Sequence, residues 1–296
     1  MNTLMVSAPA KINWTLDITG TDDRGYHLLD MLMQRISLYD VVTVSRAPTL
    51  TLTASERWLA TDERNTAYKA AKLFLESAGI SEGAALTLRK NIPSGAGLAG
   101  GSADAAAVLF GMNKLFGNLF SPAELDALAL KVGSDVPFML RDHPCRVTGT
   151  GEKLQDLGTL RPQSLLLVMN RRQPAPTKLV YGRYDAVGSA QKPDTDAFLA
   201  CLRAGDTAGL AKAHGNVLTE AAVTVAPDIG DNLRRLKESG ALCAGMTGSG
   251  SVCFGVYPNG TEAAKAGRLF PDRWHFCCET INYGLQAREL NEGGSL

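Results

Sequence analysis

The chain has 296 residues, of which 45% are hydrophobic and 20% are charged. These proportions are ordinary for a globular protein, and the length is sufficient for two domains with separate cores. Lys plus Arg and Asp plus Glu both number 30, so the formal net charge is zero. Because a nucleic-acid-binding surface normally brings a basic excess, the sequence predicts no nucleic-acid partner.

Location and metal content are also constrained by what the sequence lacks. No apolar run approaches the roughly 20 residues needed to cross a bilayer, so we expect no membrane partner. The N-terminus has no charged leader followed by an apolar segment, which favours a cytoplasmic location. The six cysteines form no C-x-x-C pair, and the four histidines add no zinc-site spacing. The sequence therefore predicts reduced thiols and no resident metal.

The first half of the chain alternates between strand and helix patterns. Short β-branched and apolar runs predict strands, and capping residues followed by helical periodicity predict helices. The predicted strands cover residues 36–45, 50–53 and 84–89, and the predicted helices cover 65–77, 102–116 and 122–132. The connection over residues 91–101 is predicted to be a loop.

The second half shows a clearer order of elements. Strands are predicted over residues 165–169, 241–247, 252–257 and 274–281, and helices over 228–239 and 261–269. This order is β-α-β-β-α-β, which is typical of a ferredoxin-like fold. Two further helices, over 195–203 and 206–214, are inserted after the first of these strands.

The most informative functional signal is the glycine-rich segment from Pro93 to Ala107. Its glycines at positions 95, 97, 100 and 101 let the backbone turn sharply and expose N–H groups. An alanine-rich helix is predicted immediately afterwards, and the N-terminus of a helix stabilises a bound phosphate. The segment therefore favours a phosphate-binding loop, although a simple strand-to-helix turn would have a similar local pattern.

Three common nucleotide-binding motifs do not fit this loop. Residues 95–100 match G-x-G-x-x-G, but a dinucleotide fold needs a second strand that ends in an acidic residue, and two helices follow instead. A Walker A loop needs Gly-Lys-Ser/Thr, which is absent. The V-A-I-K and H-R-D elements of protein kinases are also absent.

The loop instead resembles the second motif of the GHMP kinases, P-x-G-A-G-L-G-x-x-S-x-x-A-A. The first motif of that superfamily is resembled by Ser7–Asn13, and the third by Met246–Phe254, in the same order along the chain. The resemblance implies an α+β, two-domain fold. Residues 1–158 would form an ATP-binding domain with a mixed sheet and helices, and residues 159–296 a ferredoxin-like, substrate-binding domain.

Within the superfamily, three segments resemble the family of 4-diphosphocytidyl-2-C-methyl-D-erythritol kinases. They are Ala8–Trp14, Gly25–Leu28 and Gly133–Phe138. The resemblance implies phosphorylation of the 2-hydroxyl of that cytidine diphosphate compound, a step of non-mevalonate isoprenoid precursor synthesis. ATP would be the phosphate donor, and Mg²⁺ would be required.

The resemblance also implies two catalytic residues. Asp135 would accept the proton of the attacking hydroxyl, and Lys11 would keep Asp135 ionised and stabilise charge on the transferred group. Considered alone, Asp135 could merely cap a turn or a helix. No protein metal ligand is implied.

Binding roles are implied for three further groups of residues. His27 and Asn13 would contact the cytosine or the hydroxyls beside it, and Tyr26 and Tyr181 would stack on the base, with Tyr184 as an alternative to Tyr181. The ATP phosphates would contact Pro93, Gly95, Ala96, Gly97, Leu98, Ala99, Gly100, Gly101, Ser102 and Ala103. The site would be closed by Thr247, Gly248 and Ser249.

Two positions depart from the usual family pattern. A glycine is replaced by Ala99, which we expect to have a negative φ because positive φ is disfavoured for residues with a side chain. A serine is replaced by Ala103, which removes a hydroxyl that could contact phosphate or a magnesium-bound water.

Three other functions compete with this interpretation. A GHMP kinase of the mevalonate or homoserine type would not depend on a cytidine group, and Gly25–His27 counts against it. A catalytically silent, nucleotide-binding relative is favoured only by the loop substitutions, since Lys11 and Asp135 are present. A dinucleotide-dependent oxidoreductase is disfavoured, because this sequence lacks the acidic residue that would end the second strand of such a fold.

Overall fold

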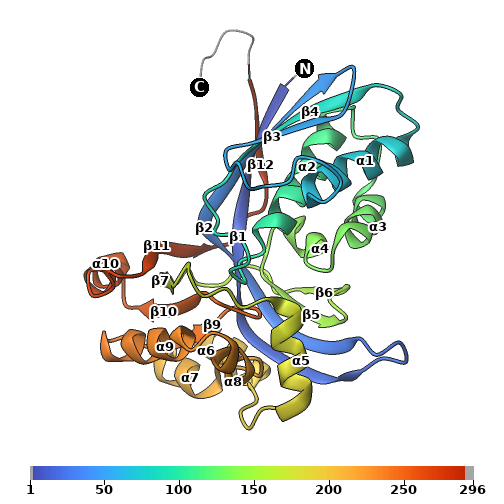
Figure 1. Ribbon diagram of the computed structural model, residues 1–296. Coiled ribbons are helices and arrows are strands. Elements are labelled where there is room, and N and C mark those ends of the chain that lie inside the picture. The colour runs from blue at the N-terminus through green and yellow to red at the C-terminus, as the bar shows by residue number, and fades with distance from the viewer. Residues whose placement is uncertain (1–2, 291–296) are drawn as a thin grey trace.

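A computed structural model describes residues 3–290. Two long antiparallel strands, β1 (Thr3–Thr21) and β2 (His27–Ala47), run through the whole molecule and link an upper and a lower part (Figure 1). Among the residues described, no helix combines the length and the apolar character needed to cross a membrane.

The upper part is a mixed sheet covered on one face by helices (Figure 1). The sheet that contains β1 and β2 also contains β3 (Thr51–Ala54), β4 (Gly83–Arg89), β5 (Cys145–Gly149), β6 (Lys153–Asp156), β8 (Gly215–Asn216) and β12 (Gln286–Glu289), and β5 pairs with the N-terminal half of β2. Its helices are α1 (Thr66–Ala78), α2 (Gly100–Leu115), α3 (Pro122–Val132) and α4 (Val136–Met139). The pairs β3–β4 and β1–β8 are parallel, which makes the sheet mixed as predicted.

The lower part confirms the predicted β-α-β-β-α-β order. Its elements are β7 (Ser164–Met169), α9 (Asp228–Glu238), β9 (Cys243–Met246), β10 (Cys253–Tyr257), α10 (Gly260–Gly267) and β11 (Trp274–Ile281). The strands are antiparallel in the spatial order β11-β7-β10-β9. Between β7 and α9 the chain inserts α5 (Thr177–Val187), α6 (Thr195–Ala204), α7 (Thr207–Ala213) and α8 (Thr219–Val225).

The two sheets are joined, because β11 pairs with both β7 and β2. In addition, β8 and β12 return to pair with β1. The chain therefore crosses between the upper and lower parts several times, and the predicted division at residues 158 and 159 stays a prediction.

The caps of the helices follow the sequence closely. The side chain of Asn65 accepts a hydrogen bond from the Ala67 N–H, and α1 ends at Gly79 with φ +64°. At the start of α3, Ser121 and Glu124 form a capping box. These local signals explain why the predicted boundaries of α1 and α3 agree with the structure.

The first strand and the N-terminal half of the second were not predicted. Every residue from Ala8 to Leu16 is buried, so the alternation that marks a half-exposed strand is missing there. The register of β1 on β2 also shifts between Pro9 and Lys11, where the strand is irregular. The predicted strand over 36–45 captures only the C-terminal half of β2.

A buried histidine lies where β1 meets the lower part. His214 packs against Phe198 and Phe254, and its Nδ1 lies 2.7 Å from the backbone oxygen of Trp14, to which it donates. Burial lowers the pKa of His214 from 6.5 to about 4, because the charged ring would lose its hydration. The native protein therefore holds this side chain neutral well below pH 6.5.

This histidine makes stability depend on pH. Because the pKa of His214 is lower in the folded than in the unfolded chain, its contribution is complete above pH 6.5 and is lost as pH falls toward 4. We expect a loss of about 3 kcal/mol of unfolding free energy across that window. Urea unfolding at several pH values would measure it. His214→Asn, which can still donate to Trp14, should flatten the profile, whereas the control His275→Asn at an exposed position should not.

Candidate active site

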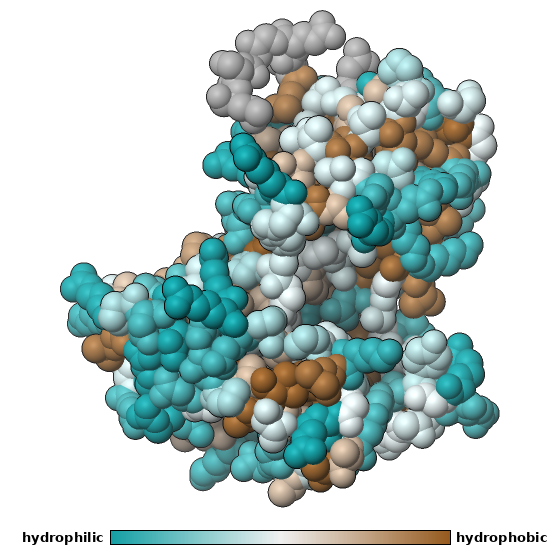
Figure 2. Space-filling view, in the orientation of Figure 1, coloured by the Kyte–Doolittle hydropathy of each residue, from teal (hydrophilic) through white to brown (hydrophobic). Residues whose placement is uncertain are grey.

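A cavity of about 480 Å³ lies between the upper and lower parts of the molecule. In the space-filling view, the surface of the molecule is hollowed between the two parts (Figure 2). Fourteen predicted site residues line it: Lys11, Asn13, Pro93, Gly95, Ala96, Gly97, Ala99, Gly100, Gly101, Ser102, Asp135, Tyr181, Gly248 and Ser249. Five others do not line it: Tyr26, His27, Leu98, Ala103 and Thr247.

The glycine loop forms one wall of this cavity. Gly95 and Gly97 have φ values of +64° and +78°, which residues with a side chain rarely adopt. Helix α2 begins at Gly100, earlier than predicted, and the cavity reaches the residues of its first turn. The N–H groups of that turn lack partners within the helix, and the helix dipole is positive there. This wall is therefore suited to bind phosphate oxygens.

Ala99 contradicts our expectation. Its φ is +57°, in the left-handed region, where it forms the N-cap of α2. The loop thus keeps the backbone conformation that a glycine would favour, at a steric cost of about 1–2 kcal/mol. Ala103 and Leu98 are fully buried and point into the core. A hydroxyl at position 103 would be enclosed by protein in this conformation.

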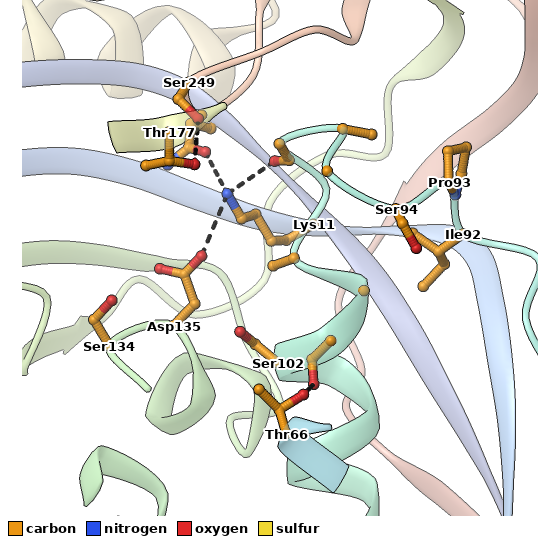
Figure 3. A pocket seen from close by; sticks show the side chains of 18 of the residues that line it. Lys11, Thr66, Ile92, Pro93, Ser94, Ser102, Ser134, Asp135, Thr177 and Ser249 are labelled. Carbon is orange, nitrogen blue, oxygen red and sulfur yellow. Dashed lines mark hydrogen bonds and ion pairs between the residues drawn. The ribbon is translucent and has the colours of Figure 1, made fainter. Parts of the chain in front are cut away.

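Lys11 and Asp135 line the cavity next to each other and form an ion pair (Figure 3). The Lys11 Nζ lies 3.6 Å from Asp135 Oδ2. The same ammonium donates to Asn13 Oδ1 at 2.7 Å and to the Gly97 carbonyl at 3.0 Å. Three acceptors therefore surround a lysine that is only 4% exposed.

The environment sets the ionisation of this pair. Burial lowers the pKa of Lys11, and the neighbouring carboxylate of Asp135 opposes that effect. Asp135 is 31% exposed and makes no capping hydrogen bond to α4, although it occupies the N-cap position. The carboxylate is thus free of a helix-capping role and can reach a ligand in the cavity.

The opposite wall comes from the turn between β9 and β10. Thr247 is buried beneath the cavity, where its hydroxyl donates to the Gly97 carbonyl and accepts from the Asn13 N–H. Ser249 lies within hydrogen-bond distance of Thr177, 2.9 Å between the hydroxyl oxygens, at the start of α5. The turn is therefore fastened to the glycine loop through Thr247 and to α5 through Ser249, and Figure 3 shows the second contact.

The predicted aromatic residues are only partly brought together. Tyr26 is 61% exposed and lies outside the cavity, with the Arg24 guanidinium over its ring. His27 packs against Tyr181, with 5.1 Å between ring centroids, and lies farther from Tyr184, at 6.3 Å. Burial raises the pKa of Tyr181 to about 12, and the charge of Asp135 adds to the effect. Tyr181, and not Tyr184, lines the cavity.

Sequence reasoning missed nine residues that line the cavity: Leu16, Leu29, Met31, Thr66, Lys90, Ile92, Ser94, Ser134 and Thr177. Ser94 and Ser134 lie inside or beside recognised motifs, so those motifs could have suggested them. Thr66 and Thr177 follow unremarkable turns, and only the packing of α1 and α5 brings them to the cavity.

These residues combine the groups that phosphoryl transfer requires. A helix N-terminus can hold phosphates, an ammonium can neutralise charge on a transferred group, and a carboxylate can accept a proton. All three face one cavity. Among residues 3–290, no group of three or more His, Cys, Asp or Glu side chains could hold a metal by itself.

Comparison with known proteins agrees with this geometry. The model of the GHMP kinases N terminal domain matches residues 65–143, and that of the GHMP kinases C terminal matches residues 198–274. The chain belongs to the GHMP kinases. This result confirms the superfamily that the three sequence motifs indicated.

Relatives within this family are similar over most of their length. A 4-diphosphocytidyl-2-C-methyl-D-erythritol kinase of Caldicellulosiruptor saccharolyticus is 38% identical over 265 residues, which cover 89% of this chain and 91% of the relative. The enzyme of the same name from Symbiobacterium thermophilum is 38% identical over 267 residues, or 89% of this chain and 93% of the relative.

Solved structures of this family share the fold. A crystal structure of 4-(cytidine 5'-diphospho)-2C-methyl-D-erythritol kinase superposes with a TM-score of 0.81 at 30% identity, covering 94% of this chain and 99% of the other. A homoserine kinase from Cytophaga hutchinsonii has a TM-score of 0.75 at 18% identity, covering 97% and 98%. The second likeness concerns the fold alone. Both agree with the predicted α+β, two-domain GHMP kinase architecture.

The strained loop residue gives a direct test of the geometry. We expect Ala99→Gly to raise the free energy of unfolding by about 0.5–1 kcal/mol, because glycine relieves the left-handed strain but gains freedom in the unfolded chain. Ala96→Gly in the same loop is the matched control, since Ala96 lacks a positive φ, and it should be destabilising. Chemical denaturation of both variants measures the difference, and a destabilised Ala99→Gly protein would contradict the loop conformation.

Proposed function

We propose that the protein transfers the γ-phosphate of ATP to the 2-hydroxyl of 4-diphosphocytidyl-2-C-methyl-D-erythritol. The observation that carries this proposal is the Lys11–Asp135 pair, which faces the phosphate-binding wall of the cavity. The chain is also 38% identical, over most of its length, to kinases of that name. This reaction belongs to non-mevalonate isoprenoid precursor synthesis.

In the proposed reaction Asp135 acts as the general base. Its carboxylate accepts the proton of the 2-hydroxyl while that oxygen forms a bond to the γ-phosphorus. The bond from phosphorus to the bridging oxygen breaks, and ADP leaves. The ammonium of Lys11, held by Asn13 and Gly97, keeps Asp135 ionised and balances negative charge on the moving phosphoryl group.

The ATP phosphates would lie against the glycine loop and the first turn of α2. A second cavity of about 340 Å³ shares Lys90, Ile92, Pro93 and Ser94 with the first and has the exposed ring of Trp58 in its wall. An adenine base connected to phosphates at the loop could extend into this second cavity. The loop would then lie between the base and the reacting phosphate.

Mg²⁺ fits the donor set of the cavity. This ion keeps several waters and uses substrate phosphates together with few protein ligands, so a site without a carboxylate cluster is suitable. The hydroxyls of Ser102 and Ser134, which line the cavity, would hold the ion together with ATP phosphate oxygens. When bound, it would neutralise part of the phosphate charge. The cytoplasmic location and the absence of a nucleic-acid partner stay predictions.

A coupled assay of ADP formation tests the base. We expect Asp135→Asn to lower kcat by about 10²–10⁴-fold while the KM for ATP changes little, because the amide cannot accept the proton. Asp196→Asn, at a residue 80% exposed on α6, is the matched control and should retain wild-type turnover. Turnover of Asp135→Asn within about tenfold of wild type would remove Asp135 from the mechanism.

The same assay tests the substrate. We expect turnover with the cytidyl compound and none with mevalonate or homoserine at equal concentration. Turnover with one of these alcohols alone would retain a kinase but contradict the cytidyl substrate. Binding of ATP without turnover of any of these three compounds would favour a catalytically silent, nucleotide-binding protein of the GHMP kinase fold.

The metal requirement has its own test. Adding EDTA should abolish ADP formation, and excess Mg²⁺ should restore it, because the phosphates lose their counter-charge without the ion. Far-UV circular dichroism should stay unchanged, since the described residues offer no structural metal cluster. Undiminished turnover in EDTA would contradict the proposed Mg²⁺ dependence.

A further inference from the structure

The turn between β9 and β10 is held from behind by Asn216 on β8. The side chain of Asn216 is buried, at 6% exposure. Its Nδ2 donates to the backbone carbonyl oxygens of Met246, at 2.9 Å, and of Gly248, at 2.8 Å. Its Oδ1 accepts from the Leu218 N–H at 3.0 Å. Both hydrogens and the oxygen of this amide therefore have partners, which fixes its orientation.

Asn216 and the active-site cavity lie on opposite sides of the turn. Gly248 and Ser249 line the active-site cavity, whereas Asn216 does not. Asn216 and Met246 instead line a different cavity of about 650 Å³, which shares no residue with the first. The carbonyl group of Gly248 points toward Asn216 and therefore away from the active site.

The direction of this carbonyl also fixes the direction of the next N–H group. The peptide bond between Gly248 and Ser249 is trans, and in a trans peptide the C=O and N–H groups point in opposite directions. The Ser249 N–H therefore points toward the active-site cavity. Within residues 3–290, no backbone carbonyl accepts a hydrogen bond from it. An N–H group in this position is available to a ligand.

The same peptide would be free to rotate without a brace. The Thr247 carbonyl accepts from the Gly250 N–H at 3.0 Å, so Gly248 and Ser249 are the two central residues of a β-turn. The orientation of the central peptide is what distinguishes several types of β-turn, and glycine at the first central position, here with φ +58°, permits more than one of them. The two hydrogen bonds from Asn216 favour one orientation.

We propose that Asn216 is a positioning residue, which holds the Gly248–Ser249 peptide so that the Ser249 N–H donates to an oxygen of the transferred γ-phosphoryl group. The turn lies against Gly97, whose carbonyl accepts from both Thr247 and Lys11, so this N–H lies on the side of the cavity where Lys11 is. A fixed backbone donor there stabilises the negative charge of the moving group. The inference rests on the proposed function, because it adds a donor to the same reaction.

The kinetic test removes the donor of the brace in two ways. Asn216→Ala deletes the amide, and Asn216→Asp keeps its size and its oxygen toward Leu218 but, when ionised, cannot donate to either carbonyl. In the coupled assay we expect both variants to lower kcat about tenfold, with little change in the KM for ATP or for the cytidyl compound. Unchanged kcat, or a rise in one KM alone, would overturn the inference.

Asn113→Ala is the matched control for a loss of stability. Asn113 is also a buried asparagine, at 7% exposure, and its side chain bonds the backbone N–H and C=O of Phe120, both at 2.9 Å. It lies near the end of α2 and does not line the active-site cavity. Asn113→Ala and Asn216→Ala should lower the free energy of unfolding in urea comparably, but only Asn216→Ala should lower kcat. An equal loss of kcat in Asn113→Ala would overturn the inference.

A spectroscopic readout is independent of turnover. Binding of a non-hydrolysable ATP analogue with Mg²⁺ should move the amide proton resonance of Ser249 downfield in wild type, because this N–H gains an acceptor, and the shift should be lost in Asn216→Ala. An unmoved resonance in wild type would overturn the inference. Failure of wild type to phosphorylate the cytidyl compound, with the shift present, would instead overturn the substrate of the proposed function and leave this contact in place.

Discussion

The turn between β9 and β10 lies directly on the glycine loop, and this backbone contact holds the two halves of the active site together. A methyl group at Gly97 would lie 2.2 Å from the carbonyl oxygen of Thr247, so only glycine permits the approach. The Gly97 carbonyl accepts from both Thr247 and Lys11. One glycine thus positions the glycine loop, the turn between β9 and β10 and Lys11 relative to one another.

The loop is fixed from its other side by buried charge. Asp40 accepts hydrogen bonds from the backbone N–H groups of Asn91 and Ile92, immediately before the loop. Lys90 pairs with both Asp40 and Asp104, and burial raises the pKa of Asp104 to about 7. Two carboxylates share one ammonium away from water, so these groups hold the loop in one conformation before ATP arrives. Such preorganisation means that little rearrangement is needed during phosphoryl transfer.

Burial differs between Lys11 and Asp135, the two proposed catalytic residues. Lys11 is almost fully enclosed, and its acceptors are the backbone and side chains that also build the site. Asp135 remains partly exposed, so a substrate hydroxyl can reach it. An enclosed cation thus lies beside an accessible carboxylate, which is the arrangement that the proposed mechanism uses. The closing turn and α5 then separate this pair from solvent on the side of the lower part.

The sequence by itself determined the features that depend on interactions between residues close together in the chain. The caps at Asn65 and Ser121 set helix boundaries, and the glycine spacing and the motif around Asp135 predicted segments that the structure brings to one cavity. Tertiary structure alone decided the rest. The long strand β1 could not be recognised from the sequence, because both of its faces are buried from Ala8 to Leu16 and no alternation of polar and apolar residues marks it. Ala99 has a left-handed backbone conformation because the surrounding loop imposes it. Likewise, Thr66 and Thr177 reach the cavity only when helices distant in sequence pack around it, since contacts between such elements leave no local pattern.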